Sequence, residues 1–580
     1  MFKTTWQPWF LLICLALAAG CQSDDTDGED GETSDTGSST TSETFESPYC
    51  DALGLSATPF QTEEGGFLFG DLAETFRANE LGGKSWMLQQ NWTGCDSYLF
   101  FTFLAFNNDN MNAYVEGLWN LSFSDLIRAS ASNVHYFFIS DEADNDGRTL
   151  RMQSMQARLQ QELTTLFPES PDDRAYWESR FHFITDKLRQ VSGSLGAYAS
   201  DFINHVETAA PVDLGDRGQA PTPYPFSFGI GRDQRWDATG SLSEYVGGPE
   251  NLKMMGYNSA FYNHRAELKA RLDAEADTTV LSLVDESVTS RVFNKDVTLP
   301  DSDTMATMDT FELDVAITCP YRNPFACSEW DRIARISLCT EFDSADIESC
   351  TASTEIVRWI TPYWRRGRRH WVMDASPFLS LIQSGGTHRF RIEMGPSWER
   401  ATERHAAMSV RLSNQDKGYK SRSVTRAFGG GNFDANYNVD REAFTFTPPT
   451  SASRVEIVTI ISGHGQTSGN GCAEWCNHVH NFTINADSSA THQVAYTDIS
   501  NDVGCAARAD EGVIPGQWGN WSQSRAGWCP GLPVETVRFD ITNQVTLGEE
   551  NSLAYDASFN GAVPPGGDIS KNTYIVWYEN

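Results

Sequence analysis

The chain has 580 residues and a formal net charge of −35, with 78 acidic and 43 basic side chains. Because nucleic-acid binding depends on basic side chains that neutralise phosphates, this balance argues against a nucleic-acid partner. About 530 residues follow the N-terminal segments, enough for two to four domains.

The N-terminus has the pattern of an export signal. The apolar run "WFLLICLALAAG" follows Lys3 and ends at Cys21, which indicates a secretory signal peptide. The ending "LAAGC" resembles a bacterial lipobox, in which the cysteine is lipid-modified and becomes the new N-terminus. We therefore expect residues 1–21 to be a lipoprotein signal with Cys21 as the lipidation site; an ordinary cleaved signal is the alternative.

The next segment is acidic and polar. Residues 22–47 contain nine acidic and no basic side chains, too little apolar surface to offset the entropy of ordering. We expect a disordered acidic tether over 22–49. The predicted location is a bacterial cell envelope, periplasmic or at the outer surface, with membrane attachment through the lipid anchor only.

Ten cysteines remain after Cys14 and Cys21 are set aside. An even number in an exported protein is typical of disulfides. Close spacing suggests four pairs, and a fifth follows by elimination. The expected disulfides are Cys319–Cys327, Cys339–Cys350, Cys472–Cys476, Cys505–Cys529 and Cys50–Cys95.

Residues 50–284 show helices alternating with short apolar runs, which predicts an α/β domain. Met155, Leu159 and Leu163 have helical spacing, and residues 263–275 predict another helix. The run "GGKSWMLQQNWTGCDSYLFF" resembles a thioredoxin-like domain, in which a strand leads a cysteine pair to the start of a helix. Only Cys95 is present here, so we expect a scaffold or interaction domain that is not redox active.

From about residue 285 the pattern becomes short β-rich runs separated by turn residues, such as "TFELDVAIT" and "RVEIVTIIS". This pattern is typical of antiparallel sandwiches. Its length exceeds that of one sandwich. We therefore expect two, over 285–410 and 411–580, with the division in the polar stretch near "SNQDKGYKSRS".

Three clusters carry candidate chemistry: "CPYRNPFACSEWDR" (319–332), "WITPYW" (359–364), and "GCAEWC" (471–476) with "RAGWCPG" (525–531). In this order they resemble the peptide-N-glycosidase F family over about 285–580. The resemblance implies two eight-stranded jelly rolls packed side by side, with the active site at their interface. It also implies a monomeric amidase that acts on N-glycosylated peptides or proteins without a cofactor or metal.

The implied reaction cleaves the amide between asparagine and an N-linked N-acetylglucosamine. It needs an activated water and a proton for the departing nitrogen, tasks that two carboxylates can divide. Matched by motif, Asp331 is the principal catalytic acid and Glu474 a second catalytic carboxylate. The substrate-binding candidates are Arg332, Trp330, Trp398 and Trp475.

The chain departs from the family at one glutamate. The family carries a third active-site glutamate two residues before the tryptophan matched by Trp398, where this chain has Pro396. Glu393 and Glu399 lie nearby but not at the matching place. Efficiency and substrate range are therefore open.

Two other functions stay open. A non-catalytic glycan-binding or adhesion lipoprotein would fit the lost glutamate. A copper-dependent monooxygenase also uses paired jelly rolls, and His478 with His480 would supply a two-histidine ligand unit. The first sandwich offers only the scattered His370, His388 and His405 for a second copper.

Overall fold

The structure is a computed structural model. It describes residues 47–104, 113, 115–117, 119–120, 122–208, 212–213, 219–220, 227–237, 252–319, 330–363, 367–397, 403–439, 441–465, 473–499, 501–517, 520–561 and 566–580. Cys21 and the acidic segment up to residue 46 therefore lie outside the described residues. The end of the expected tether is helical: Ser47 caps α1 (Pro48–Ala52) by accepting a hydrogen bond from the backbone of Cys50.

The N-terminal part is built on a mixed five-stranded sheet in the order β10-β9-β3-β4-β5. Strands β3, β4 and β5 are parallel to one another, whereas β9 pairs antiparallel with both β3 and β10. A smaller sheet, β2-β1-β6, and a ribbon, β7-β8, accompany it. The bounds are β1 (Phe76–Asn79), β2 (Ser85–Met87), β3 (Ser97–Phe103), β4 (Val134–Ser140), β5 (Phe181–Ile184), β6 (Ser192–Gly193), β7 (Val212–Asp213), β8 (Gln219–Ala220), β9 (Ser227–Ile230) and β10 (Trp236–Asp237).

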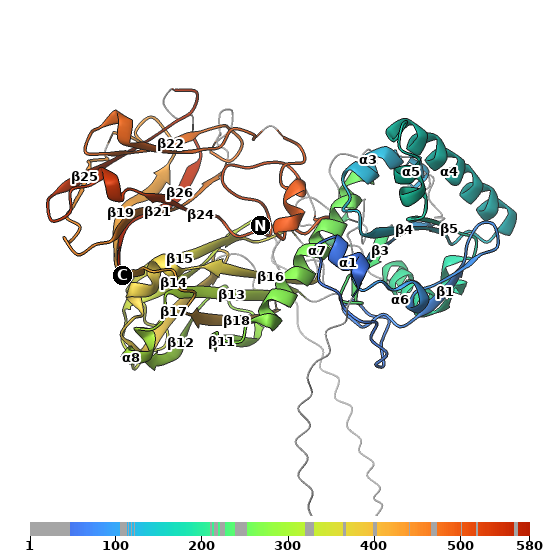
Figure 1. The fold of residues 1–580 in the computed structure, drawn as a ribbon, viewed down its shortest axis with the longest axis horizontal. Coiled ribbons are helices and arrows are strands. Elements are labelled where there is room, and N and C mark those ends of the chain that lie inside the picture. The colour runs from blue at the N-terminus through green and yellow to red at the C-terminus, as the bar shows by residue number, and fades with distance from the viewer. Residues whose placement is uncertain are drawn as a thin grey trace, which may run out of the picture. The chain divides into compact units, whose positions relative to one another are not determined.

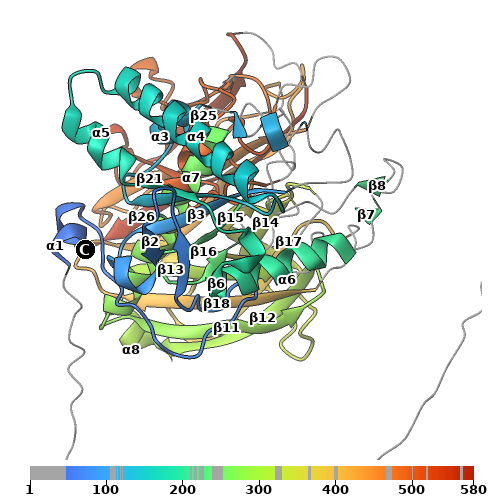
Figure 2. The same cartoon turned by 90° about the vertical axis from the view of Figure 1, so that its right-hand side faces the viewer.

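Helices cover both faces of this sheet (Figure 1 and Figure 2), with α3, α4 and α5 on one side and α6 on the other. The predicted apolar stripe of Met155, Leu159 and Leu163 is buried against the face of the sheet that α3, α4 and α5 cover. The bounds are α3 (Phe123–Arg128), α4 (Asn145–Leu166), α5 (Pro171–Glu178), α6 (Ser194–Thr208) and α7 (Leu252–Ala274).

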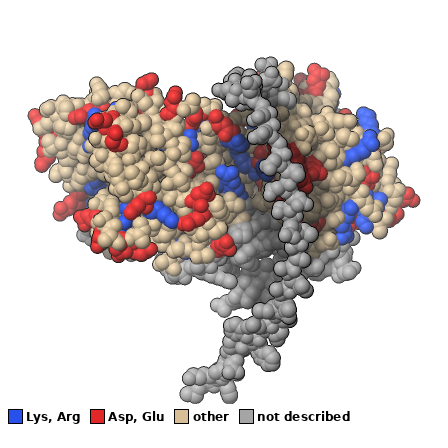
Figure 3. All heavy atoms as spheres, turned by 90° about the horizontal axis from the view of Figure 1, so that it is seen from below, with Lys and Arg blue, Asp and Glu red and all other residues tan. Residues whose placement is uncertain are grey.

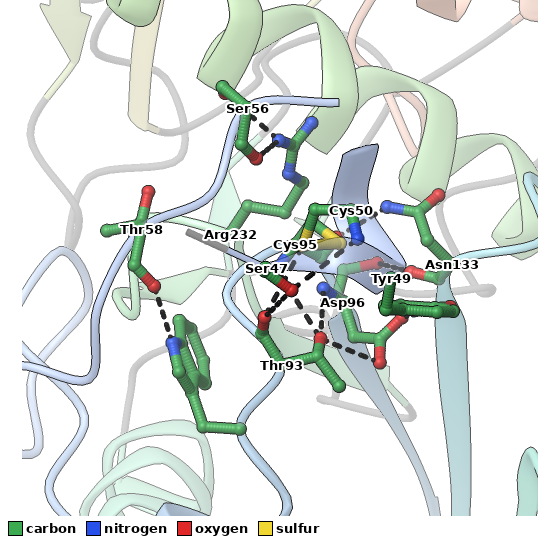
Figure 4. Close-up of a disulfide and its surroundings, with 12 residues drawn as sticks. Ser47, Tyr49, Cys50, Ser56, Thr58, Thr93, Cys95, Asp96, Asn133 and Arg232 are labelled. Atoms are coloured by element: carbon green, nitrogen blue, oxygen red, sulfur yellow. Dashed lines mark hydrogen bonds between the residues drawn. A yellow bond between two sulfur atoms is a disulfide. The ribbon is translucent and has the colours of Figure 1, made fainter. Parts of the chain in front are cut away.

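Cys95 does not begin a helix. It lies directly before β3, and it forms a disulfide with Cys50 of α1, with a Cα–Cα distance of 5.8 Å (Figure 4). The expected sequence of strand, cysteine and helix is therefore wrong at this position, because the residues after Cys95 form the buried central strand.

The first sandwich consists of two four-stranded antiparallel sheets, β11-β18-β13-β16 and β12-β17-β14-β15. Leu313, Val315 and Ile317 alternate along β13 and face the core between the sheets. Its first strand begins before residue 285, where we expected the domain to start. The bounds are β11 (Thr279–Val288), β12 (Val292–Asp301), α8 (Ser302–Met305), β13 (Thr310–Cys319), β14 (Ile333–Glu341), β15 (Ala352–Ile360), β16 (Gly367–Asp374), β17 (Gly385–Met394) and β18 (Arg404–Ser413).

The second sandwich repeats this plan with the sheets β19-β26-β21-β24 and β20-β25-β22-β23. Each sandwich thus has eight strands in the described residues, the number that the resemblance implied. The bounds are β19 (Lys420–Asn432), β20 (Phe444–Phe446), β21 (Arg454–His464), β22 (Val479–Ile484), β23 (Thr491–Ala495), β24 (Thr536–Asp540), β25 (Asn551–Ser558) and β26 (Asp568–Glu579).

The two sandwiches share backbone and side-chain bonds. Residues 531–534, which precede β24, bond to the end of β15: Ile360 donates to the carbonyl of Leu532 (3.1 Å) and accepts from Gly531 (2.8 Å). Arg358 is buried and donates to the Ser462 hydroxyl (2.9 Å). Val458, Tyr574 and Val576 of the second sandwich complete the core of the first. This junction fixes the end of β15 and the segment 531–534 relative to each other.

Three of the expected disulfides are fully described: Cys50–Cys95, Cys339–Cys350 and Cys505–Cys529. Cys319 and Cys476 are also disulfide-bonded, and their expected partners, Cys327 and Cys472, lie outside the described residues. Across the described part of the chain, no helix combines the length and apolar character needed to cross a bilayer.

Candidate functional site

The segment Trp330–Arg332 lies directly before β14 and is held by the end of β15. The backbone of Arg332 donates to the Thr361 hydroxyl (2.8 Å), and the Thr361 backbone donates to the carbonyl of Arg332 (2.8 Å). The Thr361 hydroxyl also donates to the carbonyl of Trp330 (2.9 Å). Because both flanks of Asp331 are bonded, the position of its carboxylate is set by two strands of the first sandwich.

Glu474 comes from the turn between β21 and β22 of the second sandwich. Its carbonyl accepts from the backbone of Ala526 (3.1 Å), and its Oε2 accepts from the backbone of Gly465 (3.2 Å). Cys476, two residues further on, is disulfide-bonded. The turn is thus fixed at three points around the carboxylate.

Arg525 joins the two carboxylates. Its fully buried guanidinium lies 3.3 Å from Glu474 Oε1 through Nε and 3.8 Å from Asp331 Oδ2 through Nη2. The side chains of Asp331 and Glu474 are 16% and 14% exposed, enough to meet solvent or substrate. The structure therefore brings the two predicted carboxylates, one from each sandwich, to a single cation.

Tyr363 and Asn520 complete the cluster. Tyr363 Oη donates to Asp331 Oδ2 (2.5 Å) and accepts from Arg525 Nη2 (3.1 Å). Arg525 Nη2 also donates to Asn520 Oδ1 (2.8 Å). The negative charge of Asp331 and burial both raise the pKa of Tyr363, so its hydroxyl keeps its proton for this bond.

The surroundings of the two carboxyl groups separate their pKa values. Burial and the charge of Asp331 together raise the pKa of Glu474 to about 7, against the lowering effect of Arg525. Burial also raises the pKa of Asp331, while Arg525 and the Tyr363 hydrogen bond oppose that rise. Because the negative charge of Asp331 is one of the causes that raise the pKa of Glu474, Asp331 ionises first and Glu474 titrates near neutral pH.

Aromatic rings border the cluster. The guanidinium of Arg525 lies 4.6 Å from the ring centroid of Trp475 and 4.9 Å from that of Trp528. Trp330 is 40% exposed, and its ring lies 6.4 Å from that of Tyr363. Trp330, Arg332 and Trp475 thus lie beside the carboxylates, whereas Trp398 lies outside the described residues.

Glu393 does not substitute for the missing family glutamate. Its carboxylate accepts from Arg391 Nε (2.9 Å) and pairs with Arg335 Nε (3.2 Å) within the sheet of the first sandwich. Glu399 lies outside the described residues.

His478 and His480 are structural. Both are fully buried, and His478 Nδ1 lies 2.9 Å from His480 Nε2. The remaining ring nitrogens contact the Ala473 carbonyl (2.9 Å) and the Tyr555 hydroxyl (2.7 Å). All four nitrogens are therefore engaged inside the second sandwich, which disagrees with a copper-ligand role. Within the described ranges, no group of three or more His, Cys, Asp or Glu side chains is arranged to hold a metal ion.

Three members of the cluster were not singled out from the sequence. Arg525 and Tyr363 lie inside quoted motifs, "RAGWCPG" and "WITPYW", so a signal was present without a role attached to it. Asn520 lies outside every motif, five residues before Arg525 along the chain.

Fold and site together define the class: a multidomain protein of paired antiparallel β sandwiches with a carboxylate–arginine cluster at their junction. Residues 432–576 match the family model described as "Peptide-N-glycosidase F, C terminal". Over these residues the chain is similar to the C-terminal part of the peptide-N-glycosidase F family, so the resemblance inferred from the motifs is confirmed.

A curated relative is the peptide-N(4)-(N-acetyl-beta-D-glucosaminyl)asparagine amidase F of Elizabethkingia miricola. It is 27% identical over 265 residues, covering 43% of this chain and 68% of the relative. Among solved structures, PNGase F from Flavobacterium meningosepticum, described as a glycosylasparaginase, is 24% identical with a TM-score of 0.39, covering 53% of this chain and 97% of that one. A structure of PNGF-II is 10% identical with a TM-score of 0.40, covering 54% and 68%.

Proposed function

We propose that this chain is a glycoprotein amidase that hydrolyses the amide between asparagine and an N-linked N-acetylglucosamine, without a cofactor. The observation that carries the proposal is the meeting of Asp331 and Glu474 at the guanidinium of Arg525. The amidase name of the curated relative supports it.

The separated pKa values assign the roles. Asp331, ionised first, accepts a proton as water adds to the asparagine side-chain carbonyl carbon, so in this proposal it is the base and not the catalytic acid that the motif implied. Glu474, with a pKa of about 7, gives its proton to the amide nitrogen as the carbon–nitrogen bond breaks. The products are an aspartate and a glycosylamine, which then loses ammonia to water.

Substrate contacts follow from the same geometry. The Trp330 and Trp475 rings offer apolar faces for sugar rings, and Arg332 offers hydrogen-bond donors for sugar or amide oxygens. The positive charge of Arg525 stabilises the negative charge that develops on the reacting amide between the two carboxylates.

The test is incubation of the purified chain with an N-glycopeptide in ¹⁸O-labelled water. We expect release of the intact glycan and conversion of the asparagine to an aspartate that carries the label. Asp331→Asn should lower the rate by about 100-fold or more, whereas the control Asp285→Asn, at a side chain 70% exposed, should not change it.

Absence of product from the folded wild-type chain would contradict the amidase proposal. Retained glycopeptide binding in that case would favour the non-catalytic glycan-binding lipoprotein, which Pro396 at the family glutamate position supports.

We also propose export and lipid attachment at Cys21, which the signal pattern and the disulfides support. Incorporation of a labelled fatty acid into the wild-type chain, and its loss in Cys21→Ser, is the expected result. Labelling that persists in the variant would contradict it.

For residues 50–284 we propose a thioredoxin-like fold without redox activity. The central strand β3, parallel to β4 and antiparallel to β9, supports the fold, and the pairing of Cys95 with distant Cys50 supports the lack of activity. Catalysis of thiol–disulfide exchange by the purified chain would contradict the second part.

A further inference from the structure

The N-terminal α/β part has a pocket of its own, with a volume of about 470 Å³. Its floor includes His135 and His182, with Trp86 and Trp92 beside them, and its rim includes the exposed Gln90 and Asn91. None of its lining residues belongs to the Asp331–Glu474 cluster. The pocket is within the size range of small-molecule sites.

A directional chain of hydrogen bonds crosses the floor. Arg180 Nη1 lies 2.6 Å from His135 Nε2, and because a guanidinium can only donate, this nitrogen accepts. His135 Nδ1 therefore carries the proton and donates to His182 Nε2 (2.8 Å). His182 Nδ1 in turn donates to Glu80 Oε1 (2.5 Å). The array locks every group in one orientation.

Asp96 is neutralised at the other end of the array. It accepts from Arg180 Nη1 (3.0 Å), the Tyr49 hydroxyl (3.0 Å) and the Thr93 hydroxyl (2.9 Å). Figure 4 shows Tyr49, Thr93 and Asp96 gathered beside the Cys50–Cys95 disulfide. That disulfide joins the helix bearing Tyr49 to the residue before Asp96, so the array is preorganised by a covalent bond.

The charge of the pocket narrows the class of ligand. Burial lowers the pKa of His135 to about 4 and lowers the pKa of His182 as well, so both rings are neutral at neutral pH. Arg180 offsets Asp96, which leaves Glu80 as the one net charge of the floor. Glu80 disfavours anions, and the polar floor disfavours apolar ligands.

We propose that this pocket binds a saccharide unit that carries no anionic group. Carboxylate, amide and hydroxyl groups match the mixed donors and acceptors of sugar hydroxyls, and the half-buried Trp92 ring matches the apolar face of a sugar ring. Because the bonded array fixes the floor before binding, little side-chain entropy is lost on association. The proposal does not depend on the amidase activity.

The test is titration of the full chain with glucose, galactose, mannose and N-acetylglucosamine, followed by saturation-transfer NMR and calorimetry. We expect at least one sugar to bind. The rim double variant Gln90→Ala, Asn91→Ala and the floor variant Glu80→Gln should each weaken that binding by about tenfold, because the first removes hydrogen bonds to the ligand and the second replaces a charged acceptor with a neutral amide. Circular dichroism would verify that the variants are folded.

Two control variants locate the binding. Gln153→Ala, at an exposed glutamine of α4, and Asp331→Asn should both leave the affinity unchanged. Failure of all four sugars to bind at millimolar concentrations would overturn the proposal. So would binding that survives in both folded pocket variants, or binding that is lost in Asp331→Asn, since the latter would place the sugar at the carboxylate cluster.

Discussion

Arg525 governs the site at the scale of single residues, because its buried guanidinium opposes the rise in pKa that burial causes in both Asp331 and Glu474. In the proposed mechanism kcat/KM needs Glu474 protonated and Asp331 ionised. We therefore expect a bell-shaped pH profile whose alkaline limb has an apparent pKa near 7. An alkaline limb that stays flat to pH 9 would contradict the role of Glu474.

The hydrogen bond from Tyr363 lowers the pKa of Asp331. Tyr363→Phe removes this bond, so the pKa of Asp331 should rise. The acid limb of the same profile should therefore move to higher pH while the alkaline limb changes little. Measuring kcat/KM from pH 4 to 9 checks this. An unchanged acid limb would mean that another group sets it.

The raised pKa of Glu474 also has a cost in stability. A carboxyl whose pKa rises from 4.5 to about 7 on folding favours the folded state fully below pH 4.5, and this contribution is lost as pH rises through 7. Glu474→Gln avoids the loss, so the variant should be more stable than wild type at pH 8 by up to about 3 kcal/mol.

Urea unfolding at pH 8 and pH 4 measures this difference. At pH 4, where Glu474 is protonated in both states, the advantage of the variant should vanish. Equal stability of the two proteins at pH 8 would contradict the raised pKa.

At the scale of elements, the disulfide Cys505–Cys529 closes the loop that carries Asn520 and Arg525. With a sequence separation of 24 between its two cysteines, its loss in Cys505→Ser, Cys529→Ser should lower the free energy of unfolding by about 3 kcal/mol. Because the loop also positions Arg525, glycopeptide turnover should fall. Denaturant unfolding of the double variant, with the reduced wild type for comparison, is the measurement, and an unchanged midpoint would contradict it.

The β-rich runs were predictable because alternation of side chains reports which face of a strand is buried. "TFELDVAIT" became β13 and "RVEIVTIIS" became β21 with bounds close to the runs. The start of the first sandwich was harder: the apolar run at 278–284 reads equally well as a strand of the α/β part. Only its pairing with β18 assigns it to the sandwich.

At the scale of the whole molecule, helix α7 packs against the loop of the second sandwich that the Cys505–Cys529 disulfide closes. Met254 clusters with Tyr363, Val513 and Trp521, and His264 Nδ1 lies 3.0 Å from the carbonyl of Asp510. The N-terminal part therefore supports the residue that holds Asp331, a contact between segments far apart in the sequence that no motif predicted.

Met254→Ala should accordingly lower the free energy of unfolding by about 2 kcal/mol or more through loss of buried contacts, and it should reduce turnover through Tyr363. Lys269→Ala, at a side chain of α7 that is 68% exposed, is the matched control and should have little effect. Thermal and denaturant unfolding measure both variants; equal losses would contradict a specific role for the Met254 contact.

The distribution of charge on the surface agrees with the argument against a nucleic-acid partner. Acidic and basic side chains are interspersed over the face seen in Figure 3, where no basic field covers the described surface in view. The excess of acidic side chains over basic ones was readable from composition alone.

The sequence by itself predicted the strand-rich C-terminal half and the spacing of the disulfides, because local periodicity and short motifs report on neighbours along the chain. The two carboxylates were predicted from the family resemblance. Tertiary structure alone decided that Asp331 and Glu474 share Arg525, that Cys95 precedes a strand, and that His478 and His480 are internal. Each of these depends on contacts between segments distant in sequence, whose approach is set by the packing of one sheet against another.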